Sequence, residues 1–306
     1  MKDISNRKIK HIRFSVTSKC NYKCIYCDKE GFIPKTTELT LDEITKLCRI
    51  LAEVLKVTRI KFTGGEPLCR GDIVQIIKNV HELNLYKDIS LTTNGYFLYE
   101  KAEDLYKAGL NRINVSLNSL KPEMYQQLNG SDSLNEVLKG LEKAKVVGLN
   151  PIKLNFVILK DLNEKELDDM IDFCSKTGYI LQLIELHKVS ESVGEKNGFY
   201  EKYHIGVKPF IKEFEKKARQ VIIRGNMQNR KVFIMPNEAV IETITPSHEF
   251  CMGCTKLRVG CDGNLFGCLY RSEEGRNLKE ELRNHQSLTK YEKIVKKVVE
   301  AREPYY

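Results

Sequence analysis

The sequence predicts an α/β fold, a partial (βα)6 TIM-like barrel of parallel strands, followed by a C-terminal region built from a cysteine-rich hairpin and a helix. Two observations predict the barrel. Short apolar runs that suit buried strands alternate six times with longer helical patterns. Three of these helical patterns end on a glycine just before the next strand, at Gly109, Gly148 and Gly178, where a left-handed cap favours glycine. Repeats of this kind build a parallel sheet with helices outside it.

The six predicted strands lie within the first 185 residues, at 12–16, 59–62, 89–92, 112–116, 152–157 and 180–185. The helix after the first strand begins at a capping box, in which Thr40 precedes Glu43 by three residues. Parallel barrels bind their ligands at the carboxyl ends of the strands. The loops at those ends carry "CNYKCIYC", "TGGEPL", "TTNG" and "SLNS", so we expect these motifs to converge on one rim.

The pattern changes after residue 186, and we expect two domains. Residues 1–215 would form the barrel, and residues 216–306 would form a C-terminal region that closes it. That region contains two strand-like stretches, "KVFIM" and "AVIETIT", and ends in an amphipathic helix over "KYEKIVKKVVEAR". Between them, Asp262-Gly263 is typical of a hairpin turn that brings Cys268 back towards Cys251 and Cys254.

Charge and composition exclude several classes of protein. The net charge of +9 arises from 50 basic and 41 acidic residues that are interspersed along the chain, which favours a solvated mixed surface over a nucleic-acid or membrane partner. The N-terminus has no apolar signal segment, and no run approaches the length of a membrane span. Ten cysteines are too few for a disulfide framework in 306 residues. We therefore expect a cytoplasmic protein whose thiols bind metal.

The cysteines form two sets of three. Cys20, Cys24 and Cys27 give C-x3-C-x2-C after the first strand, and Cys251, Cys254 and Cys268 surround the hairpin. Three thiolates that hold a cubane iron–sulfur cluster leave one iron open for a small molecule. The alternative is zinc, with Cys69 completing the first site and Cys261 the second. Two further cysteines fit apolar helix positions and predict packing roles, Cys48 and Cys174.

The first set has an aromatic residue, Tyr26, before its last cysteine and is followed by "GGEP" on the next loop. This combination resembles the radical S-adenosylmethionine (radical SAM) superfamily, in which a cluster reductively cleaves the cofactor to a 5'-deoxyadenosyl radical. The C-terminal "FCMGCTKLRVGCDGNLFGCL" is similar to the signature of the MoaA family, the GTP 3',8-cyclases that begin molybdenum cofactor biosynthesis. The motif "YCDKEG" and the stretch from "NRKVF" to "TPSHEFC" look most like archaeal members. The similarity runs from Arg13 to about Arg271.

The resemblance implies two [4Fe-4S] clusters, S-adenosyl-L-methionine as cofactor and GTP as substrate. The first cysteine set would hold one cluster, and the second set would hold another whose open iron binds guanine. The cofactor-binding positions would be Tyr26, Gly64, Gly65 and Ser116. The substrate-binding positions would be Arg13, Lys61, Thr92, Lys153, Lys256, Leu257 and Arg258, with Arg258 also catalytic. The glycines also suit close approach of the backbone to a ligand.

Each implied role has a simpler alternative. An isolated strand arginine such as Arg13 usually forms a surface salt bridge, and Lys153 would be solvated. Tyr26 could belong to the core. Convergence of Arg13, Lys61 and Lys153 near one rim would favour anion binding, because a buried unpaired cation is costly.

Three positions depart from the family. The first signature arginine is Lys256, which keeps the charge but loses the bidentate fork. At a position where the family contacts the cofactor with a methionine, this chain has His187. The chain ends "EPYY", whereas the family usually ends in Gly-Gly. We therefore hold three hypotheses: a GTP 3',8-cyclase, a related radical enzyme with an auxiliary cluster that acts on a peptide or other metabolite, and a zinc-stabilised nucleic-acid-binding protein.

The resemblance also implies partners. They are GTP, a low-potential electron donor and a downstream enzyme that forms cyclic pyranopterin, with no membrane and no nucleic acid. A homodimer is one option for the assembly.

Overall fold

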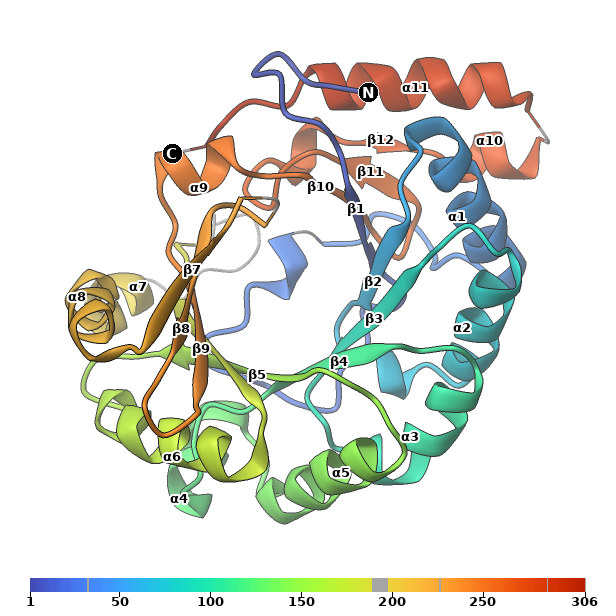
Figure 1. Cartoon of the computed structure of the whole chain (residues 1–306). Coiled ribbons are helices and arrows are strands. Elements are labelled where there is room, and N and C mark those ends of the chain that lie inside the picture. Colours follow the sequence, from blue (N-terminus) through green and yellow to red (C-terminus); the bar gives the residue numbers. More distant parts are fainter. Residues whose placement is uncertain (32, 189–197, 226, 285, 306) are drawn as a thin grey trace.

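We describe a computed structural model of the chain that covers residues 1–31, 33–188, 198–225, 227–284 and 286–305. The strands curl around a central axis and the larger helices lie outside them, so the molecule is an open α/β barrel (Figure 1). The fold class expected from the sequence is confirmed.

The six predicted strands all form, and their bounds shift by no more than one residue. They are β1 (His11–Ser15), β2 (Arg59–Thr63), β3 (Asp88–Thr93), β4 (Arg112–Ser116), β5 (Ile152–Ile158) and β6 (Ile180–Glu185). The connecting helices are α1 (Leu41–Leu55), α2 (Ile73–Glu82), α3 (Leu98–Lys107), α4 (Pro122–Asn129), α5 (Leu134–Val146) and α6 (Leu167–Thr177). The capping box of Thr40 and Glu43 is present, and Gly109, Gly148 and Gly178 take positive φ values.

The C-terminal half adds strands to both edges of the six-stranded sheet. They are β7 (Gln220–Arg224), β8 (Arg230–Ile234), β9 (Val240–Ile244), β10 (Lys256–Val259), β11 (Asn264–Phe266) and β12 (Arg276–Asn277). Its helices are α7 (Phe199–Tyr203), α8 (Lys208–Lys217), α9 (His248–Met252), α10 (Lys279–Arg283) and α11 (Leu288–Glu300). The predicted hairpin is the antiparallel pair of β10 and β11, and the predicted terminal amphipathic helix is α11, which buries Tyr291 and Val298.

Two of these added strands run parallel to the barrel strands, which the sequence pattern did not indicate. The sheet order in the described part of the chain is β12-β11-β10-β1-β2-β3-β4-β5-β6-β9-β8-β7. Strand β10 is parallel to β1, and β9 is parallel to β6, so the parallel section extends from β10 to β9. The predicted boundary at residues 215/216 stays a prediction, and one continuous sheet crosses it.

Strand alternation makes the inside of this barrel polar. In β2, Ile60 and Phe62 are buried in the core beneath the helices, whereas Arg59, Lys61 and Thr63 line the central pocket. The same period of two recurs in β1, β4 and β10. The apolar core therefore fills the layer between sheet and helices, and the interior is free to bind a polar ligand. Among the described residues, no helix is long and apolar enough to cross a bilayer.

Candidate functional site

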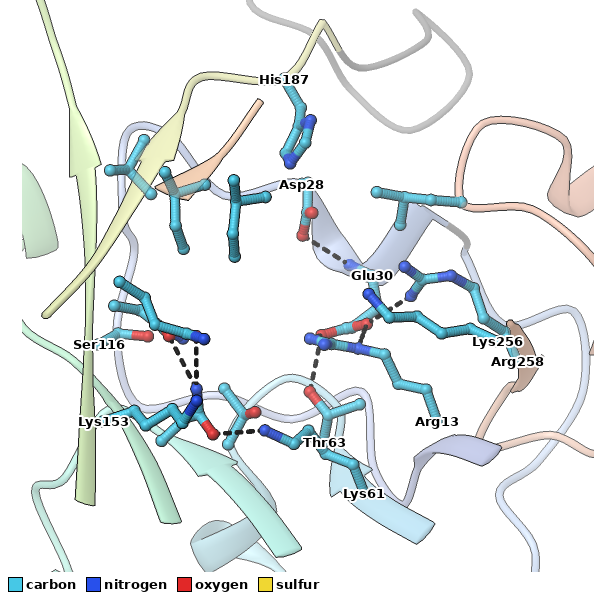
Figure 2. Close-up of a pocket in the computed structure, with 18 of the residues that line it drawn as sticks. Arg13, Asp28, Glu30, Lys61, Thr63, Ser116, Lys153, His187, Lys256 and Arg258 are labelled. Carbon is cyan, nitrogen blue, oxygen red and sulfur yellow. Dashed lines mark hydrogen bonds and ion pairs between the residues drawn. The ribbon is translucent and has the colours of Figure 1, made fainter. Parts of the chain in front are cut away.

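The barrel encloses a pocket of about 370 Å³ that runs from the cysteine-bearing loops to the start of the strands. Figure 2 shows the charged side chains that face each other across it. Among the described residues, eight basic side chains line it: Arg13, Arg59, Lys61, Arg112, Lys153, Arg230, Lys256 and Arg258. The acidic ones are Asp28, Glu30, Glu66 and Glu185. Such an excess of positive charge in an enclosed space attracts a polyanion.

Three of these cations stand side by side on neighbouring strands. Arg13 of β1 is in register with Arg258 of β10 on one side and with Lys61 of β2 on the other. All three point into the pocket (Figure 2). Burial, reinforced by Arg112 and Arg13, lowers the pKa of Lys61 well below its usual range, and Lys61 hydrogen-bonds to Asn114. The row lies within the barrel, at the middle of the strands, and not at the rim as expected from the sequence.

Glu30 neutralises two members of this row. Its carboxylate accepts hydrogen bonds from Arg13 Nε at 2.6 Å and Arg13 Nη2, from Arg258 Nη1 at 3.0 Å, and from Thr63 Oγ1 at 2.7 Å. Burial acts to raise the pKa of Glu30, but the two arginines outweigh it and lower the pKa to about 2. Glu30 is therefore an anion. The sequence offers one signal for it, its position three residues after Cys27.

Glu242 of β9 plays the same part on the opposite wall. It accepts bonds from Lys153 Nζ at 2.5 Å, Arg224 Nη1 at 2.6 Å and Gln182 Nε2 at 2.6 Å, and Arg230 lies 3.9 Å away. Lys153 is only 4% exposed, so it is a buried ion-paired residue and not a solvated one. Burial lowers the pKa of Lys153 to about 8 although Glu242 opposes this. The sequence could not reveal Glu242, because it lies 89 residues from its partner.

The first cysteine set lies at the mouth of the pocket. Cys20, Cys24 and Cys27 all line it, and burial raises the pKa of Cys24 to about 11 and that of Cys27 to about 12. Tyr26 lines it as well; its hydroxyl donates to Asn129 Oδ1 at 2.7 Å and accepts from Asn118. Three free thiols on one loop match the donor set of an iron–sulfur cluster. In the described part of the chain, no three His, Cys, Asp or Glu side chains surround a single ion position.

The "GGEP" loop packs directly against the cysteine loop. A Cβ on Gly64 would lie 2.4 Å from the Thr17 carbonyl oxygen, and one on Gly65 would lie 2.3 Å from that of Lys19. Gly65 N also donates to Thr17 O at 2.8 Å. These glycines are therefore required for close contact between two loops of the chain, in addition to the approach to a ligand that the sequence suggested. Both line the pocket.

Glu66 of the same motif is a structural carboxylate. It is 2% exposed and accepts bonds from Thr93 Oγ1 at 2.6 Å and from the backbone N of Asn94 at 2.6 Å and Leu68 at 2.9 Å. Burial raises its pKa to about 7. Glu66 thus ties the loop after β2 to the loop after β3, which holds the rim motifs together as expected.

The second cysteine set lies at the open end of the β10–β11 hairpin. Cys251, Cys254 and Cys268 line the same pocket as the first set. Burial acts to raise the pKa of Cys254, but Arg302 and Lys256 outweigh it and lower the pKa below its usual value. Three thiols in a basic setting again fit the ligands of a cluster.

Cys261 is separated from that set. It lies at the turn of the hairpin, is fully buried against Phe266 and does not line the pocket. Arg258 pairs with Phe266, so Cys254 and Cys268 lie beyond the far end of the ladder from the turn. The four residues of β10 lie between Cys254 and Cys261 and span roughly 13 Å of strand, so Cys261 is far from the other thiols of the set. The remaining cysteines divide as follows: Cys48 and Cys174 are buried, as predicted, and Cys69 faces a different pocket and hydrogen-bonds to Asn21.

The other residues implied by the resemblance divide into two groups. Thr92, Ser116 and Lys256 line the pocket, and burial lowers the pKa of Lys256 well below its usual range. Leu257 does not line it, because strand alternation turns its fully buried side chain outward into the core.

The end of the chain lies beside the second cysteine set. Arg302 donates to the carbonyl oxygens of Gly267 and Cys254, both at 3.1 Å. Tyr305 stacks on Tyr270 with ring centroids 4.3 Å apart, and the Tyr270 hydroxyl bonds His187 Nδ1 at 2.7 Å. Burial, together with Lys256 and Arg258, lowers the pKa of His187 to about 3, so its ring is neutral.

Comparisons with known proteins place this site in a family. Residues 14–174 match the model of the radical SAM superfamily, and residues 179–306 match that of Molybdenum Cofactor Synthesis C. A protein of Thermococcus kodakarensis is 42% identical over 99% of both chains, and one of Methanococcus vannielii is 41% identical over 100% of this chain and 99% of the relative. Both are named "Probable GTP 3',8-cyclase".

Solved structures show the same fold at low identity. Streptococcus suis SuiB bound to S-adenosylmethionine has a TM-score of 0.66 at 17% identity over 90% of this chain, and this chain spans 64% of SuiB. The enzyme anSMEcpe with bound AdoMet and Cp18Cys peptide has a TM-score of 0.60 at 16% identity, over 96% of this chain and 85% of that one.

The open barrel and the cysteine loop at its mouth define a radical SAM protein, which implies S-adenosylmethionine and a [4Fe-4S] cluster as cofactors. The C-terminal match and the full-length relatives narrow the class further. This chain belongs to the MoaA family of that superfamily. The matches favour neither the peptide-modifying hypothesis nor the zinc-stabilised nucleic-acid-binding one.

Proposed function

We propose that this protein is a GTP 3',8-cyclase, a lyase that converts GTP into (8S)-3',8-cyclo-7,8-dihydroguanosine 5'-triphosphate in molybdopterin biosynthesis. One observation carries the proposal: an enclosed, strongly basic barrel interior has both three-cysteine sets on its wall. A nucleoside triphosphate needs such a cationic space for its phosphates. The relatives named "Probable GTP 3',8-cyclase" support the choice of nucleotide.

Two clusters fit the two cysteine sets. Cys20, Cys24 and Cys27 would hold one [4Fe-4S] cluster, and Cys251, Cys254 and Cys268 a second that faces the guanine base. S-adenosylmethionine would contact Tyr26, Gly64, Gly65 and Ser116. When bound, the first cluster and this cofactor supply the 5'-deoxyadenosyl radical that takes the hydrogen from C3' of the ribose.

The residues of the chain would bind and orient GTP. Arg13 would provide charge-assisted hydrogen bonds to the triphosphate. Lys61 and Lys153 would do the same once the phosphate charge holds their ammonium groups protonated, and Thr92 and Lys256 extend this polar wall. Arg258 has the catalytic position beside the second cysteine set. Leu257 can contribute only through its backbone, because its side chain packs outward. The barrel walls exclude water, which a carbon radical requires.

We propose separate roles for the two regions of the chain. Residues 1–215 would bind the radical-forming cofactor and residues 216–306 the second cluster. The protein would work in the cytoplasm with a low-potential electron donor, and its product would pass to an enzyme that forms cyclic pyranopterin.

The test is direct. The protein is reconstituted anaerobically with iron and sulfide and incubated with S-adenosylmethionine, a reductant and GTP, and the products are analysed by mass spectrometry. The expected result is about eight iron and eight sulfide per chain, with 5'-deoxyadenosine and an isomer of GTP in equal amounts. Two zinc ions without sulfide, or 5'-deoxyadenosine formation that GTP does not couple to a cyclised product, would refute the proposal.

A further inference from the structure

Like charges crowd one wall of the pocket. Arg258, Arg13 and Lys61 occupy matching positions on three adjacent strands. Neighbouring strands lie about 4.8 Å apart, and like charges directly opposite each other destabilise a sheet. Without a counter-charge, the guanidinium groups of Arg13 and Arg258 would repel each other and turn apart. The two arginines come from opposite ends of the chain, so no local interaction fixes their relative orientation.

Glu30 supplies the counter-charge with both of its oxygens. Arg13 and Thr63 donate to Oε1, and Arg13 and Arg258 donate to Oε2. The side chain of Glu30 is 11% exposed, and its backbone has a φ of 57°. Its backbone N donates to Asp28 Oδ1 at 3.0 Å, which fixes the turn that carries it (Figure 2). One carboxylate thus joins the cysteine loop to β1, β2 and β10.

Both arginines keep free donors. Glu30 engages Nε and Nη2 of Arg13 and Nη1 of Arg258. In the described residues, Arg13 Nη1 and the Nε and Nη2 of Arg258 donate no hydrogen bond, and both residues line the pocket. The fixed pair therefore presents unused donors to the cavity, in the orientation that the carboxylate sets.

We propose that Glu30 is a positioning residue that holds Arg13 and Arg258 as one preorganised anion-binding pair for the triphosphate of the substrate. This inference rests on the proposed function. Glu30 acts through the two arginines and does not bind the substrate itself. Its charge therefore fixes the orientation of the arginines and does not strengthen GTP binding. Binding groups that are fixed before the reaction place the reacting atoms, and a misplacement of about 1 Å can cost about a hundredfold in rate.

The variant Glu30→Gln tests this, because it keeps the shape and removes the charge. We expect kcat for the cyclised product to fall by about tenfold to a hundredfold. The yield of product per 5'-deoxyadenosine should fall with it, because a misplaced ribose loses the radical. The KM and the Kd for GTP, measured by equilibrium dialysis without reductant, should stay the same or decrease, since a negative charge beside the triphosphate has been removed.

The control is Asp72→Asn, which removes a carboxylate that holds an arginine, Arg70, through both of its oxygens outside the pocket of the site. It should keep the wild-type yield per 5'-deoxyadenosine. When Arg258→Ala is already present, Glu30→Gln should lower the yield by a smaller factor than it does in the wild-type protein, because both changes act on the same arginine pair. Thr63→Val is the second variant, for the case that Glu30→Gln does not retain its cluster. It removes one hydrogen-bond donor to Glu30 and should lower the yield by a smaller factor.

The outcomes separate the hypotheses. A fall in KM with unchanged kcat would show that Glu30 only competes with the substrate, and the proposal would be wrong. An unchanged yield in both Glu30→Gln and Thr63→Val would also overturn it. If the wild-type protein does not convert GTP, the proposed function fails and the role of Glu30 fails with it; if the wild type does and Glu30→Gln matches it, only the inference about Glu30 fails.

Discussion

Glu242 and Lys153 form a buried ion pair whose two members should not be equally costly to remove. Glu242 compensates Lys153, Arg224 and Arg230 together, so Glu242→Gln leaves two buried cations, Lys153 and Arg230, without their shared counter-charge. Lys153→Met leaves Glu242 still bonded to Arg224 and Gln182, both at 2.6 Å. We therefore predict that the glutamate variant is much the less stable of the two.

The magnitude follows from burial. The side chains of Lys153 and Glu242 are 5% and 2% exposed, so solvent screens neither charge. Leaving a buried charge without its partner costs about 3–5 kcal/mol, which we expect for Glu242→Gln. Lys153→Met should cost only about one hydrogen bond, roughly 1 kcal/mol. Methionine fills a volume similar to that of lysine, and the carboxylate of Glu242 stays paired with Arg224. The difference between the two variants should thus be about 2–4 kcal/mol, from these two estimates.

Urea unfolding of the cofactor-free protein at pH 7, followed by circular dichroism, measures this difference. With a slope of about 3 kcal/mol per M, Glu242→Gln should lower the midpoint by about 1 M or more. The pKa of Glu242 is about 2, because Lys153 and its hydrogen bonds outweigh the opposing effect of burial. The stability it contributes is present above about pH 4.5 and lost as the pH falls towards 2. Equal losses in the two variants would refute this account.

Three further predictions concern the site. Cys24→Ala should abolish 5'-deoxyadenosine formation while about four iron per chain remain, because the two cysteine sets share no ligand; undiminished cleavage would sink the assignment of the first set. Cys268→Ser should lose the second cluster and GTP turnover, whereas Cys261→Ala should retain both, since Cys261 is buried away from the pocket; similar iron loss in both variants would mean four protein ligands. Arg13→Ala should weaken GTP binding by roughly tenfold to a hundredfold, the worth of one charge-assisted contact, and an unchanged Kd by equilibrium dialysis would point to another substrate.

Several features of the site follow from local sequence alone. The spacing of Cys20, Cys24 and Cys27 and the motif that contains Gly64 and Gly65 identify the loops that converge on the rim, and both loops line the pocket. The reason for the glycines differs in part from the expected one, because a Cβ at Gly64 would collide with the backbone of Thr17 and one at Gly65 with that of Lys19. Local sequence can indicate that a glycine is needed, but not which atoms approach it.

The sequence by itself determined the six strands and the helix that Thr40 caps, because each depends on the pattern of residues along one segment. Only the tertiary structure decided that β9 and β10 join the parallel sheet and that Glu30 and Glu242 neutralise its cations. Arg258 lies 228 residues from Glu30, and nothing in either segment specifies the other. Such pairs depend on strand order and register, which arise when the whole chain packs, so local patterns cannot encode them.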